Sequence, residues 1–272
     1  MTEEDSPQKW AFKLTHILNT CFGHDHFPID VSEIAKGFSQ DLYPKDPIIR
    51  VQGDDISGLE GCLIKAPEPM KGWGIIYNDA VTSEGRINFT LAHEFGHYLQ
   101  HRRKYPEGLR CGEEDLYRWD SEYGQVEHQA NIFASNFLMP LDDYREHLLP
   151  GAKADLEQVS DMADRYGVSL TAAALRWIDY TEKPAILILS RDGFLLWAKS
   201  SSEAYRNGYF LRSKQQIIPV PNGSLTHELT KHGTQRLEGT HSKETRWGDW
   251  RCLEHCLLSD QYDFAMTILH IL

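Results

Sequence analysis

The chain has 272 residues, which is enough for two domains of ordinary size, and its 41% hydrophobic and 25% charged residues are typical of a globular protein. It contains no uninterrupted apolar stretch of the roughly 18 residues that a membrane helix needs, and its acidic N-terminal residues lack the basic and apolar segments of a signal peptide. Of the 28 Lys and Arg, 11 follow residue 180, and of the 40 Asp and Glu only 10 do, so the net charge of −12 belongs to residues 1–180. The acidic first part repels phosphate, whereas the nearly neutral last part stays open to nucleic acid.

Helix and strand patterns are mixed in the first half of the chain, which predicts an α+β fold. Apolar residues at helical spacing occur at Lys9–Leu18 and at Ile29–Ala35, where Asp30 or Ser32 can cap the helix. Short apolar runs bounded by Gly, Pro, Asp and Asn predict three strands of a small sheet, namely Ile48–Gln52, Leu59–Lys65 and Gly72–Asn78.

The next segments alternate between helix and loop. Arg86–Arg102 has the strongest helix pattern of the first half, and the polar stretch Arg103–Tyr123, with its Gly and Pro residues, is predicted to be a long loop. Glu127–Leu138 is predicted to be a helix that stops before Pro140, because proline cannot continue a helix interior. A helical pair is expected from about Asp155 to Tyr180.

The pattern changes at Pro184, and a domain boundary is predicted at 181–184. Two short apolar runs flank Asp192-Gly193, which predicts a β-hairpin. Further strands are expected at Leu211–Val220, Cys252–Leu258 and Tyr262–Leu272. The predicted organisation is therefore a first domain of residues 1–181 followed by a smaller α+β domain of residues 182–272.

The helix predicted at Arg86–Arg102 contains the pattern His-Glu-x-x-His. At 3.6 residues per turn, His93 and His97 lie on one face, where two ring nitrogens can occupy adjacent corners of a zinc tetrahedron. Glu94 projects beside that face and can accept a proton from water and later deliver it to a leaving amine. The motif follows predicted strands, which is the context that this chemistry requires, so a chance pentapeptide on a surface helix is the weaker interpretation.

A hydrolytic zinc site needs a third protein ligand and one open position. Glu127 and Asn131 are four residues apart on the next predicted helix, so the carboxylate can bind zinc while the Asn131 amide orients a ligand histidine. The same spacing also fits a solvent-exposed helix face. Other acidic residues precede this helix and stay candidates on spacing alone, namely Glu113, Glu114, Asp115 and Glu122.

Phe89–Leu99 and Glu127–Pro140 resemble the two motifs of the ImmA/IrrE family of bacterial metallopeptidases, in the expected order. The resemblance covers roughly residues 10–180 and implies a zincin-like metallopeptidase domain of helices and a small sheet. It also implies Glu127 as the third zinc ligand and Glu94 as the base. Many members have a second acidic residue where this chain has Gln129, which makes Glu127 the less ambiguous ligand.

Cys111 is a candidate inhibitory ligand of the same metal. The five cysteines are irregularly spaced, which favours a reducing, cytoplasmic compartment over a disulfide framework. Arg110-Cys111-Gly112 lies in the loop predicted between the ligand helices and resembles the cysteine switch of matrix metalloproteinase precursors. Its thiolate would fill the open zinc position in a latent enzyme, and the alternative is an inert loop cysteine.

The resemblance also implies a function. Family members cleave helix-turn-helix repressors and so release stress, mobile-element or antiphage genes, which predicts a cytoplasmic, zinc-dependent endopeptidase acting on such a repressor. Residues 182–272 resemble, in strand pattern and position, the GAF-like sensor module that follows this peptidase in some relatives. Nucleic acid is the first expectation for the activating signal, and a small ligand is the alternative.

A competing interpretation makes the chain a non-catalytic, signal-binding transcriptional regulator, in which zinc is structural and Cys111 permanently fills its fourth position. Glu94 separates the two interpretations, because only a peptidase needs a carboxylate beside the metal. The group that stabilises the oxyanion stays open, with Tyr98, Tyr123 and His128 as candidates.

Overall fold

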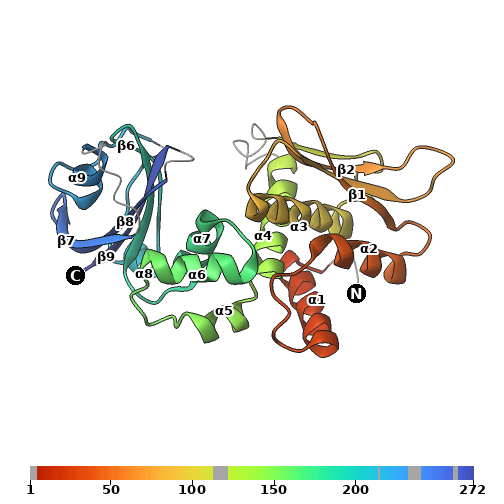
Figure 1. Cartoon of the computed structure of the whole chain (residues 1–272), viewed down its shortest axis with the longest axis horizontal. Coiled ribbons are helices and arrows are strands. Elements are labelled where there is room, and N and C mark those ends of the chain that lie inside the picture. The colour runs from red at the N-terminus through yellow and green to blue at the C-terminus, as the bar shows by residue number, and fades with distance from the viewer. Residues whose placement is uncertain (1–4, 113–121, 214, 232–239, 260–262) are drawn as a thin grey trace. The chain divides into compact units, whose positions relative to one another are not determined.

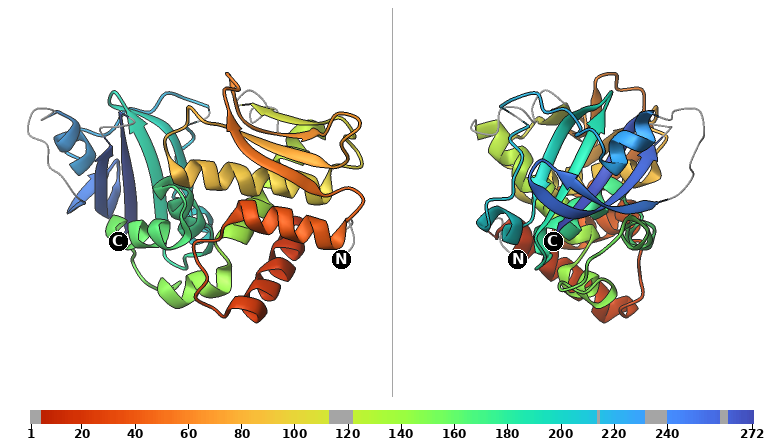
Figure 2. Two further views of the ribbon diagram at one scale, coloured as in Figure 1. Left: turned by 45° about the vertical axis from the view of Figure 1, so that its right-hand side comes forward. Right: turned by 90° about the vertical axis from the view of Figure 1, so that its left-hand side faces the viewer.

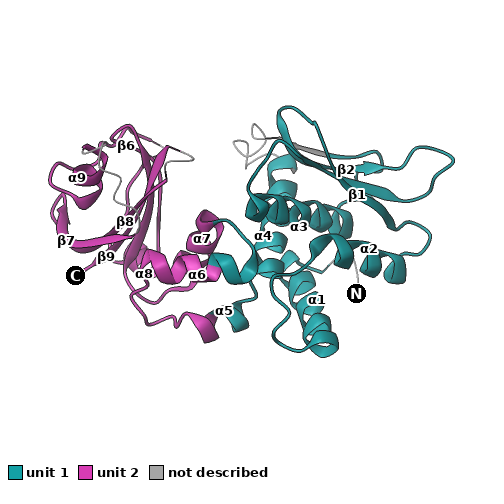
Figure 3. Ribbon diagram, viewed as in Figure 1, with its two compact units in different colours: residues 1–144, 163–169 teal, residues 145–162, 170–272 magenta. Residues whose placement is uncertain are grey.

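The computed structural model describes residues 5–112, 122–213, 215–231, 240–259 and 263–272, without the side chains of residues 110–112 and 122. It has helices and two β-sheets (Figure 1), which confirms the predicted α+β class. The chain divides into two compact units, one of residues 1–144 and 163–169 and one of residues 145–162 and 170–272 (Figure 3). Among the described helices, none is both long and apolar enough to cross a membrane. The boundary at 181–184 stays a prediction about domain organisation.

The first unit is built around a four-stranded sheet with a helix along one face (Figure 2). Its strand order is β1-β3-β2-β4, with β1 parallel to β3 and the other pairs antiparallel. The predicted helices and the first three predicted strands of this unit are present, and Asp30 caps α2 by accepting the Glu33 amide at 3.0 Å. The elements are α1 (Pro7–Phe22), α2 (Val31–Leu42), β1 (Ile48–Asp54), β2 (Leu59–Lys65), β3 (Trp73–Asn78), α3 (Glu84–Gln100), β4 (Gly108–Gly112) and α4 (Glu122–Leu138).

The stretch Arg103–Tyr123 is not a loop throughout, so that prediction was wrong in part. Residues 108–112 form β4, which pairs with β2 in a register that sets Leu109 opposite Leu63. Leu109 is buried, whereas the strand has no run of apolar residues that would reveal it. A short strand of this kind is stabilised by pairing with its neighbour. The sequence of the strand alone does not reveal that pairing. Residues 113–121, with the acidic candidates Glu113, Glu114 and Asp115, lie outside the described residues.

The second unit is built around a five-stranded antiparallel sheet with the order β6-β5-β9-β8-β7. Asp192 and Gly193, with φ of 52° and 78°, form the turn of the predicted hairpin. The strand predicted at Leu211–Val220 is wrong, because the described residues there form only the isolated bridge of Pro219 to Phe194. The remaining elements are α5 (Leu141–His147), α6 (Leu156–Tyr166), α7 (Leu170–Tyr180), β5 (Ala185–Arg191), β6 (Phe194–Ser200), α8 (Ser202–Arg206), α9 (Leu225–Lys231), β7 (His241–Trp247), β8 (Trp250–Ser259) and β9 (Phe264–Ile271).

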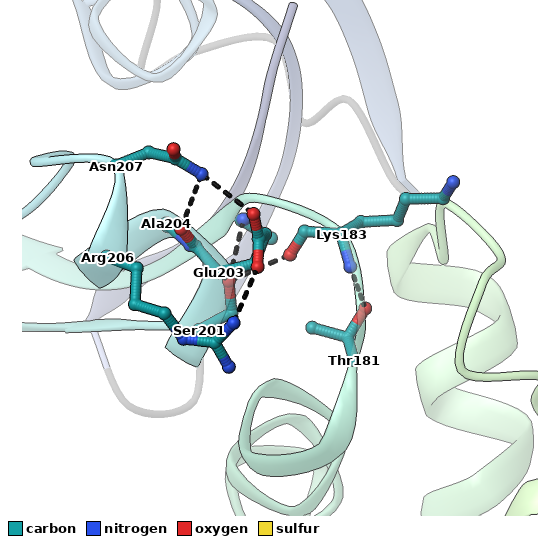
Figure 4. A network of polar contacts seen from close by, with 8 residues as sticks. Thr181, Lys183, Ser201, Glu203, Ala204, Arg206 and Asn207 are labelled. Carbon is teal, nitrogen blue, oxygen red and sulfur yellow. Dashed lines mark hydrogen bonds and ion pairs between the residues drawn. The ribbon is translucent and has the colours of Figure 1, made fainter.

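Ser201 connects the start of β5 to α8 (Figure 4). Its fully buried hydroxyl donates to the carbonyl of Lys183 at 2.8 Å and accepts the amides of Ala185 and Ala204, each at 3.1 Å. One side chain therefore caps α8 and satisfies a β5 amide at the same time. The helix has only five residues, too few for a periodic pattern, which is why the sequence does not predict it.

Both faces of the second sheet are covered. On one face, the carboxylate of Glu254 in β8 accepts the amides of Leu225 and Thr226 in α9, at 3.0 and 2.9 Å, and the hydroxyls of Thr226 and Thr245, at 2.7 and 2.6 Å. Glu254 is completely buried, so these four hydrogen bonds replace the water that the carboxylate has lost. The carboxylate thereby fixes α9 on the sheet.

The opposite face carries His270 of β9, which is fully buried and lies against Trp177 of α7 at a ring distance of 5.6 Å. Its Nε2–H donates to the carbonyl of Ala154 at 2.7 Å. Burial lowers the pKa of His270 to about 4, and the neighbouring positive charges of His255 and Lys153 act in the same direction. The hydrogen bond to Ala154 and the charge of Asp155 oppose the shift without reversing it.

Neutral His270 should make this fold sensitive to acid. Because the pKa of His270 is about 4 in the folded protein and about 6.5 in the unfolded chain, its contribution is complete above pH 6.5 and is lost as the pH falls toward 4. Between pH 7 and pH 5 this linkage is worth on the order of 2 kcal/mol. His270→Gln keeps an N–H donor but does not titrate, so its unfolding free energy should fall less over that interval than that of the wild type.

Denaturant unfolding at the two pH values measures the difference. His24→Gln, at an exposed histidine, is the matched control and should follow the wild type. Equal pH dependence of the wild type and His270→Gln would show that His270 does not contribute to the acid sensitivity.

Candidate metal centre

Helix α3 carries the His-Glu-x-x-His pattern through the interior of the first unit. Ser83 begins the helix by accepting the Arg86 amide at 3.4 Å, and every residue from Thr90 to Leu99 is buried. A Cβ on Gly96 would lie 2.9 Å from the ring of Phe133 in α4, so the two helices approach more closely than any larger residue would allow. This close contact brings α4 side chains to the histidines of α3.

Three donor atoms converge where α3 and α4 meet. The Nε2 atoms of His93 and His97 lie 2.9 Å apart. Oε2 of Glu127 lies 3.1 Å from Nε2 of His93, and Oε1 lies 3.3 Å from Nε2 of His97. All three side chains are buried, with at most 7% of any residue exposed. Among the residues that the structure describes, this is the only group of three that could hold a metal ion.

The donor set fits zinc. Two imidazole nitrogens and one carboxylate are the ligands that hydrolytic zinc sites commonly use, and tetrahedral coordination at about 2.1 Å places ligand atoms about 3.4 Å apart. The observed separations of 2.9 to 3.3 Å need only a small expansion to reach that value. The spacing of the three donors therefore fits a zinc ion.

Burial and charge act against each other on the three groups. Burial alone would lower the pKa of His93, but the hydrogen bond to Glu127 and the negative charges of Glu94 and Glu127 outweigh it and raise the pKa. Burial and the charge of His93 lower the pKa of His97 to about 3. The pKa of Glu127 lies below its ordinary range, because its hydrogen bonds to both histidines overcome its burial. Glu127 is thus held as a carboxylate beside the rings.

Each histidine also has a partner at its second ring nitrogen. His93 Nδ1 donates to Asn131 Oδ1 at 3.0 Å, which is the contact that the sequence predicts for an orienting amide. His97 Nδ1 lies 3.0 Å from Nδ1 of His101, whose Nε2 lies 2.9 Å from Gln129 Oε1. The sequence analysis missed His101 in this role, although it continues the four-residue spacing of the two histidines.

Glu94 is completely buried and lies on the sheet side of α3. A Cβ on Gly61 of β2 would lie 3.0 Å from Glu94 Oε1 and 2.5 Å from Thr90 Cγ2, so only glycine lets β2 lie this close to the carboxylate. The register of β2 and β4 sets Cys111 opposite Gly61. The backbone of Cys111 therefore belongs to the strand next to the one that covers Glu94, while its side chain lies outside the described part of the chain.

Of the oxyanion candidates, Tyr98 is engaged elsewhere. Its hydroxyl donates to the carbonyl of Asp46 at 2.8 Å, and its ring packs edge-on against Trp73. Tyr98 follows His97 directly, so it projects from a different side of the helix. His128 is exposed and Tyr123 is half-buried.

The segment that carries this site is similar to a known protein family. Residues 62–177 match the IrrE N-terminal-like domain of the peptidase M78 family. Among solved structures, the chain is similar in fold to a protein described as a Mycobacterium tuberculosis transcriptional regulator, with a TM-score of 0.53 and 13% identity over 95% of this chain and 76% of that one. No curated protein sequence matches the chain significantly.

The convergence of the three donors predicts that Glu127→Gln binds zinc much more weakly than the wild type. An amide carries no negative charge, and loss of a direct ligand should exceed the roughly 10- to 100-fold loss that follows removal of an outer partner. Elemental analysis after dialysis should find one zinc per wild-type chain and almost none in the variant.

Glu146→Gln, at an exposed glutamate on α5, is the matched control and should keep its zinc. Full zinc retention in Glu127→Gln would move the third ligand to the acidic residues of 113–122.

Proposed function

Since residues 62–177 match the IrrE N-terminal-like domain of the peptidase M78 family, we propose that this protein is a zinc-dependent metalloendopeptidase. His93, His97 and Glu127 hold the metal, Asn131 orients His93, and Glu94 is the general base. The observation that carries the proposal is the convergence of two Nε2 atoms and a carboxylate within 3.3 Å, next to the buried Glu94.

Zinc, when bound, supplies a Lewis acid that makes water a better nucleophile near neutral pH and polarises the scissile carbonyl. Glu94 accepts one proton of the attacking water as the new carbon–oxygen bond forms. It then delivers this proton to the amide nitrogen as the carbon–nitrogen bond breaks, which leaves a carboxylic acid and an amine. The surroundings of Glu94 support this role, because β2 at Gly61 excludes bulk solvent from that side of the carboxylate.

A helix-turn-helix repressor is the substrate that the family resemblance favours, and its cleavage would induce stress or antiphage defence genes in the cytoplasm. Residues 182–272 would receive the activating signal, with nucleic acid as the first candidate and a small ligand as the second. The nearly balanced charge of this part supports nucleic acid better than the acidic first part does. The printed description of the similar structure as a transcriptional regulator agrees with a role in gene control.

Replacement of Glu94 separates the peptidase from a non-catalytic regulator. Glu94→Gln should bind zinc as the wild type does, because the residue is not a ligand, but should cleave the repressor about 10² to 10⁴ times more slowly, because an amide cannot accept the proton of water. Cleavage of a helix-turn-helix repressor encoded beside this gene, followed by electrophoresis with and without a chelator, measures the effect.

Asp142→Asn, at an exposed acid on α5, is the matched control and should cleave normally. Cleavage by Glu94→Gln at the wild-type rate would rule out the mechanism. A wild-type protein that binds zinc but cleaves nothing would favour the alternative, a signal-binding transcriptional regulator with a structural zinc.

Latency through Cys111 is the regulatory part of the proposal. The register of β4 with β2 supports it, since Cys111 pairs with the residue that lies against Glu94. A thiolate in the fourth zinc position would exclude water, and its release would open the site. Cys111→Ser should therefore raise basal cleavage and weaken the dependence on an activator.

Cys21→Ser is the matched control, because Cys21 is an exposed cysteine of α1 and its replacement should leave basal cleavage unchanged. Zinc-edge absorption of the resting wild type should detect one sulfur neighbour. A spectrum without sulfur, together with unchanged basal activity in Cys111→Ser, would make Cys111 an ordinary strand residue.

A further inference from the structure

The two histidines of the candidate metal centre are oriented in different ways. His93 donates from Nδ1 to Asn131 Oδ1, so its Nε2, which faces the centre, is the nitrogen left to bind a metal. The atom described next to His97 Nδ1 is Nδ1 of His101, at 3.0 Å. Whether His97 can present a lone pair to a metal therefore depends on which of these two rings carries the proton between them.

The contact between Gln129 and His101 determines which nitrogen of His101 carries the proton. The atom of Gln129 that meets His101 Nε2, at 2.9 Å, is the amide oxygen, which can only accept a hydrogen bond. His101 must then carry its proton on Nε2, and in the neutral ring its Nδ1 is an acceptor. His97 consequently donates its Nδ1–H to His101, and its Nε2 is the nitrogen left to bind a metal.

We propose that His101 and Gln129 are positioning residues that fix the tautomer and ring orientation of His97 for metal binding. The proposal rests on the metal site assigned above and adds to it a second route of orientation, separate from the Asn131 contact of His93. The order of hydrogen bonds is His97 Nδ1–H to His101 Nδ1, then His101 Nε2–H to Gln129 Oε1. Neither residue touches the reacting atoms.

The position of the two residues supports such a role. His101 is 5% exposed and directly follows α3, one helical turn beyond His97, so its ring is held by the packing of the first unit. Gln129 is exposed and lies on α4, the helix that also supplies Glu127 and Asn131. Replacement of Gln129 therefore changes its hydrogen bond to His101 with little effect on the core.

The test compares the zinc affinity of two pairs of variants by competition with a coloured chelator. His101→Phe keeps the size of the ring but removes its acceptor, and should weaken zinc binding by about 10- to 100-fold. His101→Asn packs less well but places an oxygen near the former Nδ1, and should bind zinc more tightly than His101→Phe. A merely structural role would give the opposite order, because the phenyl ring fills the space better.

The second pair of variants replaces the exposed Gln129, so the packing of the core does not affect the comparison. Gln129→Glu can only accept and should bind zinc at least as tightly as the wild type, whereas Gln129→Met, of similar length, should bind more weakly. Gln125→Met, at an exposed glutamine of the same helix, is the matched control and should leave the affinity unchanged. Equal affinities of the wild type, Gln129→Met and His101→Phe would overturn the proposal.

Nuclear magnetic resonance of the ¹⁵N-labelled, zinc-loaded protein provides a readout that is independent of activity. The wild type should show His97 protonated on Nδ1 and His101 protonated on Nε2, and the reverse assignment would also overturn the proposal. The proposed function and the relay fail in different ways. If the wild-type chain binds no zinc, the metal site itself is refuted. If it binds zinc but His101 is not protonated on Nε2, only the proposed role of His101 and Gln129 is refuted.

Discussion

The close packing of α3 against α4 is the constraint on which the candidate site depends. Gly96 has no side chain, and Phe133 occupies the space where a Cβ would lie, at 2.9 Å. Phe133 also packs edge-on against Phe95 of α3, with ring centres 5.8 Å apart, so the contact is filled and rigid. Because the helices meet there, Glu127 reaches the two histidines, and the three donors lie on regular elements rather than on a loop.

Burial then determines what each polar group of the site can do. A histidine or carboxylate in the interior is stable only when its polar atoms have partners, and these partners also select one tautomer or charge state. Asn131 and His101 do this for His93 and His97, in each case through the nitrogen that faces away from the centre. The interactions that stabilise the fold here are the same ones that prepare the rings for a metal.

Glu127 of the first unit and Glu254 of the second are buried carboxylates with different surroundings. Glu127 is paired with histidines, whose ring nitrogens can exchange a proton for a metal. Both oxygens of Glu254 instead accept hydrogen bonds from backbone amides and hydroxyls. Cys252 and Cys256 lie on the same strand, and burial raises the pKa of both thiols. Glu254 therefore supports the fold of the second unit, whereas Glu127 lies beside two rings that could bind a metal with it.

The sequence by itself determined what depends on local geometry: the longer helices, the first three strands, the hairpin at Asp192-Gly193, and two histidines on one helix face, because these follow from spacings within about one turn. It did not determine β4 or α8, which are short and stabilised by pairing and capping contacts with distant segments. Nor did it determine that Glu127 faces both rings, that Tyr98 turns to Asp46, or that His101 lies at Nδ1 of His97. Those outcomes required the tertiary structure, since each depends on how α4 and the sheet lie against α3, and a helix pattern records which residues share a face but not what faces them.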